Sequence, residues 1–102
     1  MTAVPNEWLC RKGTPEEFER AELQRKASAF NLQFEAVAQK FGARPFGQMT
    51  DHWRAFVAKL EMADELWQFS SPAEMFAKKM GCAGYAIVRD GTIRDTFITT
   101  MT

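Results

Sequence analysis

Apolar residues recur at helical spacing through the first half of the chain. The segment Thr14-Pro15-Glu16-Glu17 offers an N-cap hydroxyl, a proline at the first helical position and a glutamate that can bond back to the cap. Gly42 and Pro45 then mark the stop. The pattern predicts an amphipathic helix over residues 15–41, whose apolar stripe, about 100° wide, holds Leu23, Ala27, Phe30, Phe34, Val37, Ala38 and Phe41.

The length of this helix raises a question about its continuity. At 1.5 Å per residue it would extend ~40 Å, more than the diameter of a compact 100-residue domain. Either it breaks near residues 28–31, or one end projects and packs on something else. A second apolar row on its opposite side sharpens the question, because a surface helix of a monomer should be polar there: Phe18, Ala21, Ala29, Leu32 and Ala36.

The middle of the chain predicts two more helices and a strand. Thr50 or Asp51 can cap a second helix, which we expect to end near Ala63. Residues 66–70 indicate a short strand. A capping sequence that starts at Ser71 then predicts a third helix, closed by Gly81.

The last twenty residues show the clearest β pattern. Asp90-Gly91 between β-branched residues is typical of a type I′ hairpin turn, in which both central residues have positive φ. The two strands of this hairpin divide their apolar residues between two faces: Val88, Ile93 and Phe97 with Gly84 on one, and Tyr85, Ile87 and Ile98 on the other.

Together these elements predict the α+β class. We expect one long N-terminal helix, or two, then a second helix and a β-α-β-β unit that ends in the Asp-Gly hairpin, with the helices on one face of a small three-stranded sheet. Residues 1–13 are expected to be an extended lead-in that docks through Trp8. The length of 102 residues predicts a single α+β domain over residues 1–102.

Charge narrows the choice of partners. The chain has 13 Lys plus Arg against 13 Asp plus Glu, so it lacks the basic excess that phosphate neutralisation requires, and nucleic acid is disfavoured as a partner. No run of apolar residues is long enough to predict a membrane span. The first residues have neither a basic nor an apolar leader segment, which predicts a cytoplasmic protein.

Few residues suggest chemistry. Cys10 and Cys82 lie far apart and only one histidine, His52, could join them, so no metal or cofactor is expected. The pair Asp64-Glu65 precedes a predicted strand, where a loop could expose both carboxylates. A small enzyme or ligand-binding domain that uses His52, Asp64, Glu65 or Cys82 is therefore an alternative, and a non-enzymatic role is favoured over it.

The favoured hypothesis comes from a surplus of large apolar residues. Nine Phe, three Trp, one Tyr and six Met must be housed, and a three-stranded sheet with helices on one side buries only one of its faces. Either the Trp8 segment covers the second face, or that face binds another protein or a second copy of the chain. The candidate interface residues are Phe18, Leu32, Tyr85, Ile87, Arg89, Arg94 and Ile98.

One segment resembles known sequences. DELWQFSSP at residues 64–72, followed by GYAIVRDG at residues 84–91, is similar to small uncharacterised proteins of proteobacteria and phages. The resemblance covers residues 64–94 and implies a bacterial or phage origin but no activity. The sequence thus predicts a small interaction, regulatory or inhibitor module.

Overall fold

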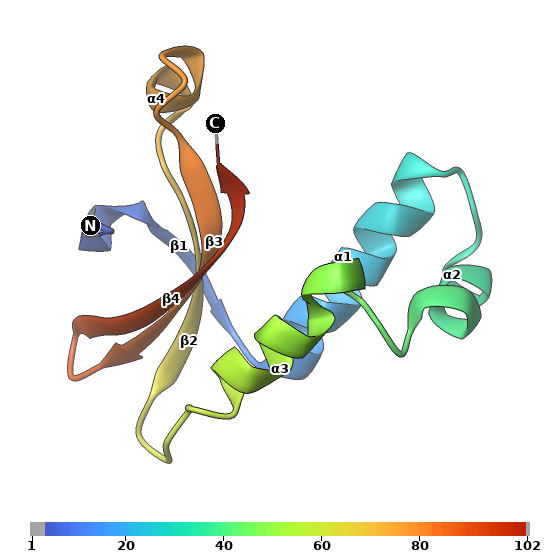
Figure 1. Ribbon diagram of the computed structural model, residues 1–102, viewed down its shortest axis with the longest axis horizontal. Coiled ribbons are helices and arrows are strands. Elements are labelled where there is room, and N and C mark those ends of the chain that lie inside the picture. Colours follow the sequence, from blue (N-terminus) through green and yellow to red (C-terminus); the bar gives the residue numbers. More distant parts are fainter. Residues whose placement is uncertain (1–3, 102) are drawn as a thin grey trace. The chain divides into compact units, whose positions relative to one another are not determined.

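A computed structural model describes residues 4–101 (Figure 1). The chain divides into two compact units, and each is considered by itself. The sheet unit comprises the chain up to residue 13 and from residue 59 onward, whereas the helical unit comprises residues 14–58. The prediction of a single domain over residues 1–102 stays a prediction. Both helix and sheet are present, which confirms the α+β class.

The sheet unit contains a four-stranded antiparallel sheet in the order β1-β2-β3-β4. The prediction of three strands is therefore wrong. The additional strand comes from the supposed lead-in: after a 3-10 turn that includes a half-buried Trp8, the chain forms β1 and pairs with β2. The strands are β1 (Leu9–Gly13), β2 (Glu65–Ser70), β3 (Cys82–Arg89) and β4 (Thr92–Met101), and the short helix α4 (Ala73–Ala77) joins β2 to β3.

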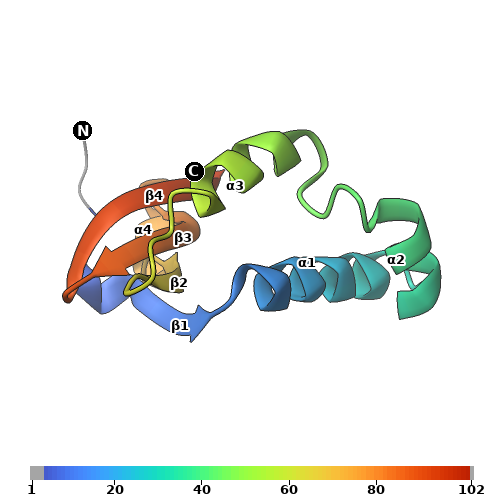
Figure 2. The same cartoon turned by 90° about the horizontal axis from the view of Figure 1, so that it is seen from below.

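The hairpin of β3 and β4 (Figure 2) has the predicted turn but a different register. Asp90 and Gly91 have φ values of 53° and 76°, as a type I′ turn requires. Val88 lies opposite Ile93 as predicted, but the register then shifts, so that Tyr85 lies opposite Phe97. This irregularity adds one residue to β4, as a β-bulge does, and moves Phe97 to the face of Tyr85. Ile98 lies opposite Gly84 and moves to the face of that residue, so the predicted placement of Phe97 with Val88 and of Ile98 with Tyr85 is wrong.

Both faces of the sheet carry buried apolar residues on its two inner strands, β2 and β3. In an antiparallel ladder, residues directly opposite each other share a face. One face therefore carries the buried Leu66, Tyr85, Ile87 and Phe97, and the other carries the buried Phe69, Ala86 and Val88.

Gly84 allows β4 to approach β3 closely. A Cβ atom at this position would lie 2.0 Å from the carbonyl oxygen of Phe97 and 2.9 Å from the Cα of Ile98. Both obstacles are backbone atoms, which side-chain rotation cannot move away. Glycine is the residue that fits here, because it alone brings no Cβ.

The helical unit contains α1 (Pro15–Ala29), α2 (Phe34–Phe41) and α3 (Thr50–Val57). The predicted helix over residues 15–41 is therefore two helices, as one of the two interpretations required. Helix α1 begins with the predicted capping box between Thr14 and Glu17. Helices α1 and α2 pack together (Figure 1) around a core of Leu23, Ala27 and Val37, against which Phe34 and Phe41 are partly buried.

A second buried group in this unit centres on Trp53 of α3. Its indole is fully buried and donates a hydrogen bond of 3.0 Å from Nε1 to Oε2 of Glu19. The ring of Phe46 lies 4.5 Å away, centroid to centroid. Helix α3 is shorter than predicted, because it ends at Val57 and not near Ala63. Its buried apolar residues are Trp53 and Phe56.

Two predicted helix caps act differently. The hydroxyl of Thr50 is already inside α3 and accepts a hydrogen bond from the N–H of Phe46. Ser71 lies before α4 without capping it, and its hydroxyl accepts from the N–H of Cys82. Helix α4 also stops before Gly81, because Lys79 takes a φ of 59° and turns the chain there. Gly81 instead packs against the ring of Phe76, which a Cβ would approach to 2.5 Å.

Candidate functional site

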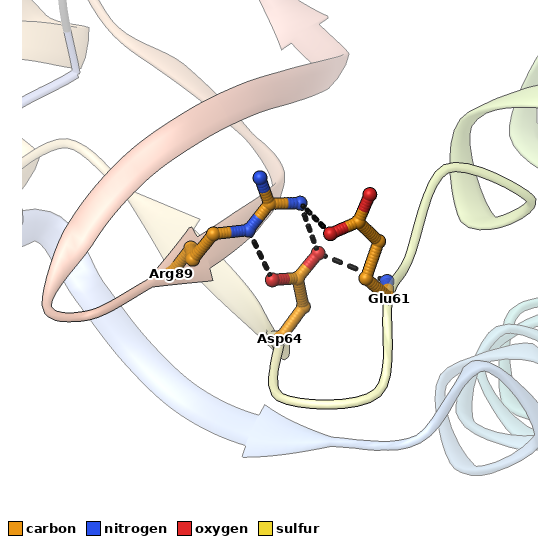
Figure 3. Close-up of polar contacts among 3 residues, drawn as sticks. All are labelled: Glu61, Asp64 and Arg89. Carbon is orange, nitrogen blue, oxygen red and sulfur yellow. Dashed lines mark hydrogen bonds and ion pairs between the residues drawn. The ribbon is translucent and has the colours of Figure 1, made fainter.

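The most connected polar cluster joins the loop before β2 to the end of β3 (Figure 3). Arg89 forms a two-point ion pair with Asp64, with 2.7 Å from Nε to Oδ1 and 2.9 Å from Nη2 to Oδ2. The same Nη2 lies 3.0 Å from Oε2 of Glu61. The N–H of Glu61 also donates to Oδ2 of Asp64 at 3.0 Å. The strand register explains why Asp64 and Arg89 are neighbours: Glu65 lies opposite Val88 in the antiparallel pair of β2 and β3, so the residues that precede Glu65 and follow Val88 lie side by side.

These contacts fix the charge state of Asp64. Hydrogen bonds from Arg89, and then from the N–H of Glu61, lower its pKa to about 2. The bond to Asp64 in turn raises the pKa of Arg89. A carboxylate that is ionised throughout the physiological range and already accepts three hydrogen bonds is poorly suited to act as a general base. The cluster ties the loop to the sheet.

Glu65 belongs to a separate contact with β1. Its Oε1 accepts a hydrogen bond of 3.0 Å from the indole Nε1 of Trp67, and its Oε2 lies 3.1 Å from Nζ of Lys12. Both hydrogen bonds lower the pKa of Glu65, and the bond from Trp67 has a larger effect than the bond from Lys12. The carboxylates of Asp64 and Glu65 are therefore bound to different partners, and do not form the paired ligand that their adjacency in the sequence suggested.

The remaining residues of the alternative ligand site lie elsewhere. Cys82 begins β3 and Arg89 ends it. At the usual rise per residue, the two residues are about 20 Å apart along the strand. His52 is exposed on α3 in the helical unit. Within residues 4–101, no three His, Cys, Asp or Glu side chains are grouped as metal ligands would be. The structure does not bring Asp64, Glu65 and Cys82 together into one site.

The predicted interface residues divide into buried and accessible ones. Phe18, Tyr85 and Ile87 are 1%, 3% and 2% exposed within the single chain, so they are unavailable to a partner in this conformation. Arg89 is held by its carboxylates, and Ile98 is half-buried. Only Leu32 and Arg94 are exposed.

Two exposed apolar side chains lie on the turn between α1 and α2: Phe30, which the sequence placed on the core-facing stripe, and Leu32, which it named as an interface residue. Between α1 and α2, Phe30 is 65% exposed and Leu32 is 47% exposed. Asn31 between them has a φ of 54°, and its N–H donates to the carbonyl of Ser28 while the N–H of Leu32 donates to that of Ala27. This pair of bonds is a Schellman motif, which fixes the turn and stops the helix.

The signal for this turn was present but ambiguous. Phe30 fits the apolar stripe only if the helix continues through residue 31. Asparagine is enriched in the left-handed conformation relative to other non-glycine residues, so Asn31 was a signal for a helix stop between two apolar neighbours. We refer to residues 30–32 as the apolar turn.

Comparison of the chain with protein-family models, with curated proteins and with solved structures gave no match. None of the described helices has the length and apolar character needed to cross a bilayer.

Proposed function

We propose that this protein is a non-enzymatic interaction module that binds another protein through the apolar turn. The observation that carries the proposal is the exposure of Phe30 and Leu32 on a turn held by two backbone hydrogen bonds. A fixed turn presents its side chains with little loss of conformational freedom on binding. The carboxylates suggested for chemistry favour this proposal over an enzyme, because Asp64 and Glu65 are each engaged in ion pairs within the fold.

The size of the apolar turn indicates how it would bind. A fully buried aromatic side chain covers 150–250 Å², so Phe30, which is 65% exposed, can supply roughly 100–160 Å², and the smaller Leu32, 47% exposed, adds less than that. A stable interface needs about 800 Å² from each partner. The turn is therefore suited to be an anchor that enters an apolar pocket, with weaker contacts around it. Self-association through two such convex turns is less favourable, because neither copy would supply the pocket.

The resemblance of residues 64–94 to bacterial and phage proteins supports a bacterial or phage setting for this role. A regulatory or inhibitory module fits the proposal, since such a module needs a binding surface and no chemistry of its own.

The experiment places a photo-crosslinking amino acid at position 30 in cells that express the native protein. We expect a discrete crosslinked protein, and we expect its loss when Leu32→Ser is added. The matched control carries the crosslinker at Gln24, an exposed position on α1. Equal crosslinks from both positions, crosslinks only to a second copy of the chain, or none at all would overturn the proposal.

A stability control accompanies this test. Phe30→Ser and Leu32→Ser remove exposed side chains, so each should change the free energy of unfolding by about 0.5 kcal/mol or less. Burial of each anchor stabilises a complex by about 1.5–3 kcal/mol, so the double variant should bind the partner at least ~100-fold more weakly.

A further inference from the structure

A second exposed surface lies in the sheet unit, at the end where α4 joins the sheet. It consists of Lys78, Lys79, Met80 and Met101, which we refer to as the lysine–methionine patch. Met80 is 63% exposed and Met101 is 74% exposed. The two methionines belong to the same end of the sheet, because Met101 lies opposite Cys82 and Met80 precedes Cys82 by two residues. Figure 1 shows the end of β4 on the side of α4.

The two lysines are uncompensated. Both are exposed, and within the described part of the chain neither makes an ion pair, a side-chain hydrogen bond or a contact with an aromatic ring. Glu74, one helical turn before Lys78, is also exposed but lies outside ion-pair distance. Three other cations of this unit, Lys12, Lys59 and Arg89, each contact a carboxylate of the chain, whereas the exposed Arg94 lies on β4 outside this patch.

The backbone turn that carries the patch includes a residue in an unfavourable left-handed conformation. Lys79 has a φ of 59°, and the N–H groups of Lys79 and Met80 donate to the carbonyls of Phe76 and Met75 at 3.0 and 2.9 Å. This is the Schellman motif again, with lysine where glycine is favoured. A long side chain in the left-handed region is an outlier from which a functional role can reasonably be inferred.

We propose that the lysine–methionine patch binds an acidic segment of another protein in which apolar side chains alternate with carboxylates. Lys78 and Lys79 would pair with the carboxylates, which complement their charge. Met80 and Met101 would contact the apolar side chains, for which the flexible and polarisable thioether is well suited. This surface belongs to the sheet unit and is independent of the apolar turn.

Charge also argues against two other occupants. Binding to an anionic membrane gains about 1 kcal/mol per basic residue, and proteins that bind such membranes usually use clusters of four to eight Lys or Arg residues. This patch has two. A second copy of the chain, related by two-fold symmetry, would place the same residues on both sides and oppose lysine to lysine. An acidic peptide avoids both difficulties.

The test titrates the full-length, ¹⁵N-labelled protein with a short synthetic peptide in which glutamate and leucine alternate, and follows the backbone amide resonances. At low salt we expect saturable shifts centred on residues 78–82 and 100–101, and weaker binding as salt is raised. A peptide of alternating lysine and leucine should give none of these shifts.

Variants connect the binding to the named side chains. Lys78→Glu with Lys79→Glu should weaken peptide binding about tenfold or more, because two exposed ion pairs contribute about that factor. The charge control, Lys26→Glu with Lys40→Glu in the helical unit, changes the net charge equally; these lysines lie 5.9 and 5.5 Å from the ring of Phe41, so folding of the variant is checked first, and it should bind the peptide as the unchanged protein does. Met80→Ser should weaken binding without altering its salt dependence.

Three results would overturn the proposal. The first is no saturable shift, or shifts confined to other residues. The second is equal weakening by the control pair, which would mean that net charge alone governs the interaction. The third is a different occupant: vesicles of phosphatidylserine and phosphatidylcholine that bind while the peptide does not, or concentration-dependent shifts at the patch without any peptide.

Discussion

Replacing Gly84 with alanine should destabilise the sheet severely. The new Cβ would lie 2.0 Å from the carbonyl oxygen of Phe97 and 2.9 Å from the Cα of Ile98. Both atoms belong to the backbone of β4, so relief requires the strand to move away from β3 and weaken its ladder. Overpacking of this kind costs about 1–3 kcal/mol, and the upper end applies because no flexible side chain can yield. At about 4–8 °C per kcal/mol, Gly84→Ala should lower the melting temperature by about 10–20 °C.

Urea and thermal unfolding, followed by circular dichroism and tryptophan fluorescence, would measure this effect. Gly91→Ala is the control, because Gly91 has a φ of 76° but nothing within 4 Å of its Cβ position. That variant tests backbone strain without steric overlap, and should cost about 1 kcal/mol. If Gly84→Ala unfolded at the same urea concentration as the unchanged protein, or were less destabilised than Gly91→Ala, the close approach of β3 and β4 would be refuted.

Three further predictions concern the helix ends and the ion pair. Lys79→Gly should stabilise the fold by up to about 1 kcal/mol and Asn31→Gly by less, since asparagine already tolerates positive φ; equal or negative shifts in the urea midpoint would contradict this. Thr14→Ala removes the capping hydroxyl of α1 and should cost about 1 kcal/mol in the same assay, whereas an unchanged midpoint would show that the box contributes nothing. Because the pKa of Asp64 is lowered from 3.8 to about 2, its pair with Arg89 should stabilise the fold fully above pH 4 and lose that contribution as the pH falls towards 2. The difference in unfolding free energy between the unchanged protein and Asp64→Asn should therefore shrink over that interval. A constant difference would refute the assignment.

Sequence reasoning succeeded where the determinants are local. The capping box joins Thr14 to Glu17, three residues apart, and the Asp90-Gly91 turn needs only its own two residues. It failed where a partner is distant. The ion pair of Lys12 with Glu65 joins residues 53 positions apart. The segment Leu9–Gly13 is only five residues long and contains two charged residues, so its sequence does not predict an edge strand. The hairpin register failed because the irregularity beside Val88 depends on packing, not on turn chemistry.

The candidate site shows the same division. Asp64 and Arg89 were both singled out from the sequence, one as a ligand residue and one as an interface residue, but the 25 positions between them concealed that they bind each other. Asn31 ends α1 within the segment where one of the two interpretations placed a break, whereas Lys79 ends α4 before the predicted stop at Gly81. The apolar turn and the lysine–methionine patch lie at these two left-handed residues.

The insertion of the whole helical unit between β1 and β2 has a consequence for the order of assembly. Strands β2, β3 and β4 are consecutive and can pair without waiting for other parts of the chain. Strand β1 can join only by closing a loop of some 53 residues, which costs about 3.5 kcal/mol in chain entropy if the intervening segment is unfolded. Folding of the helices removes much of that disorder beforehand. The pairing of β1 is thus coupled to the state of the inserted helices, and loosening of that unit should lower amide protection in β1 (Leu9–Gly13) more than in β2, β3 and β4.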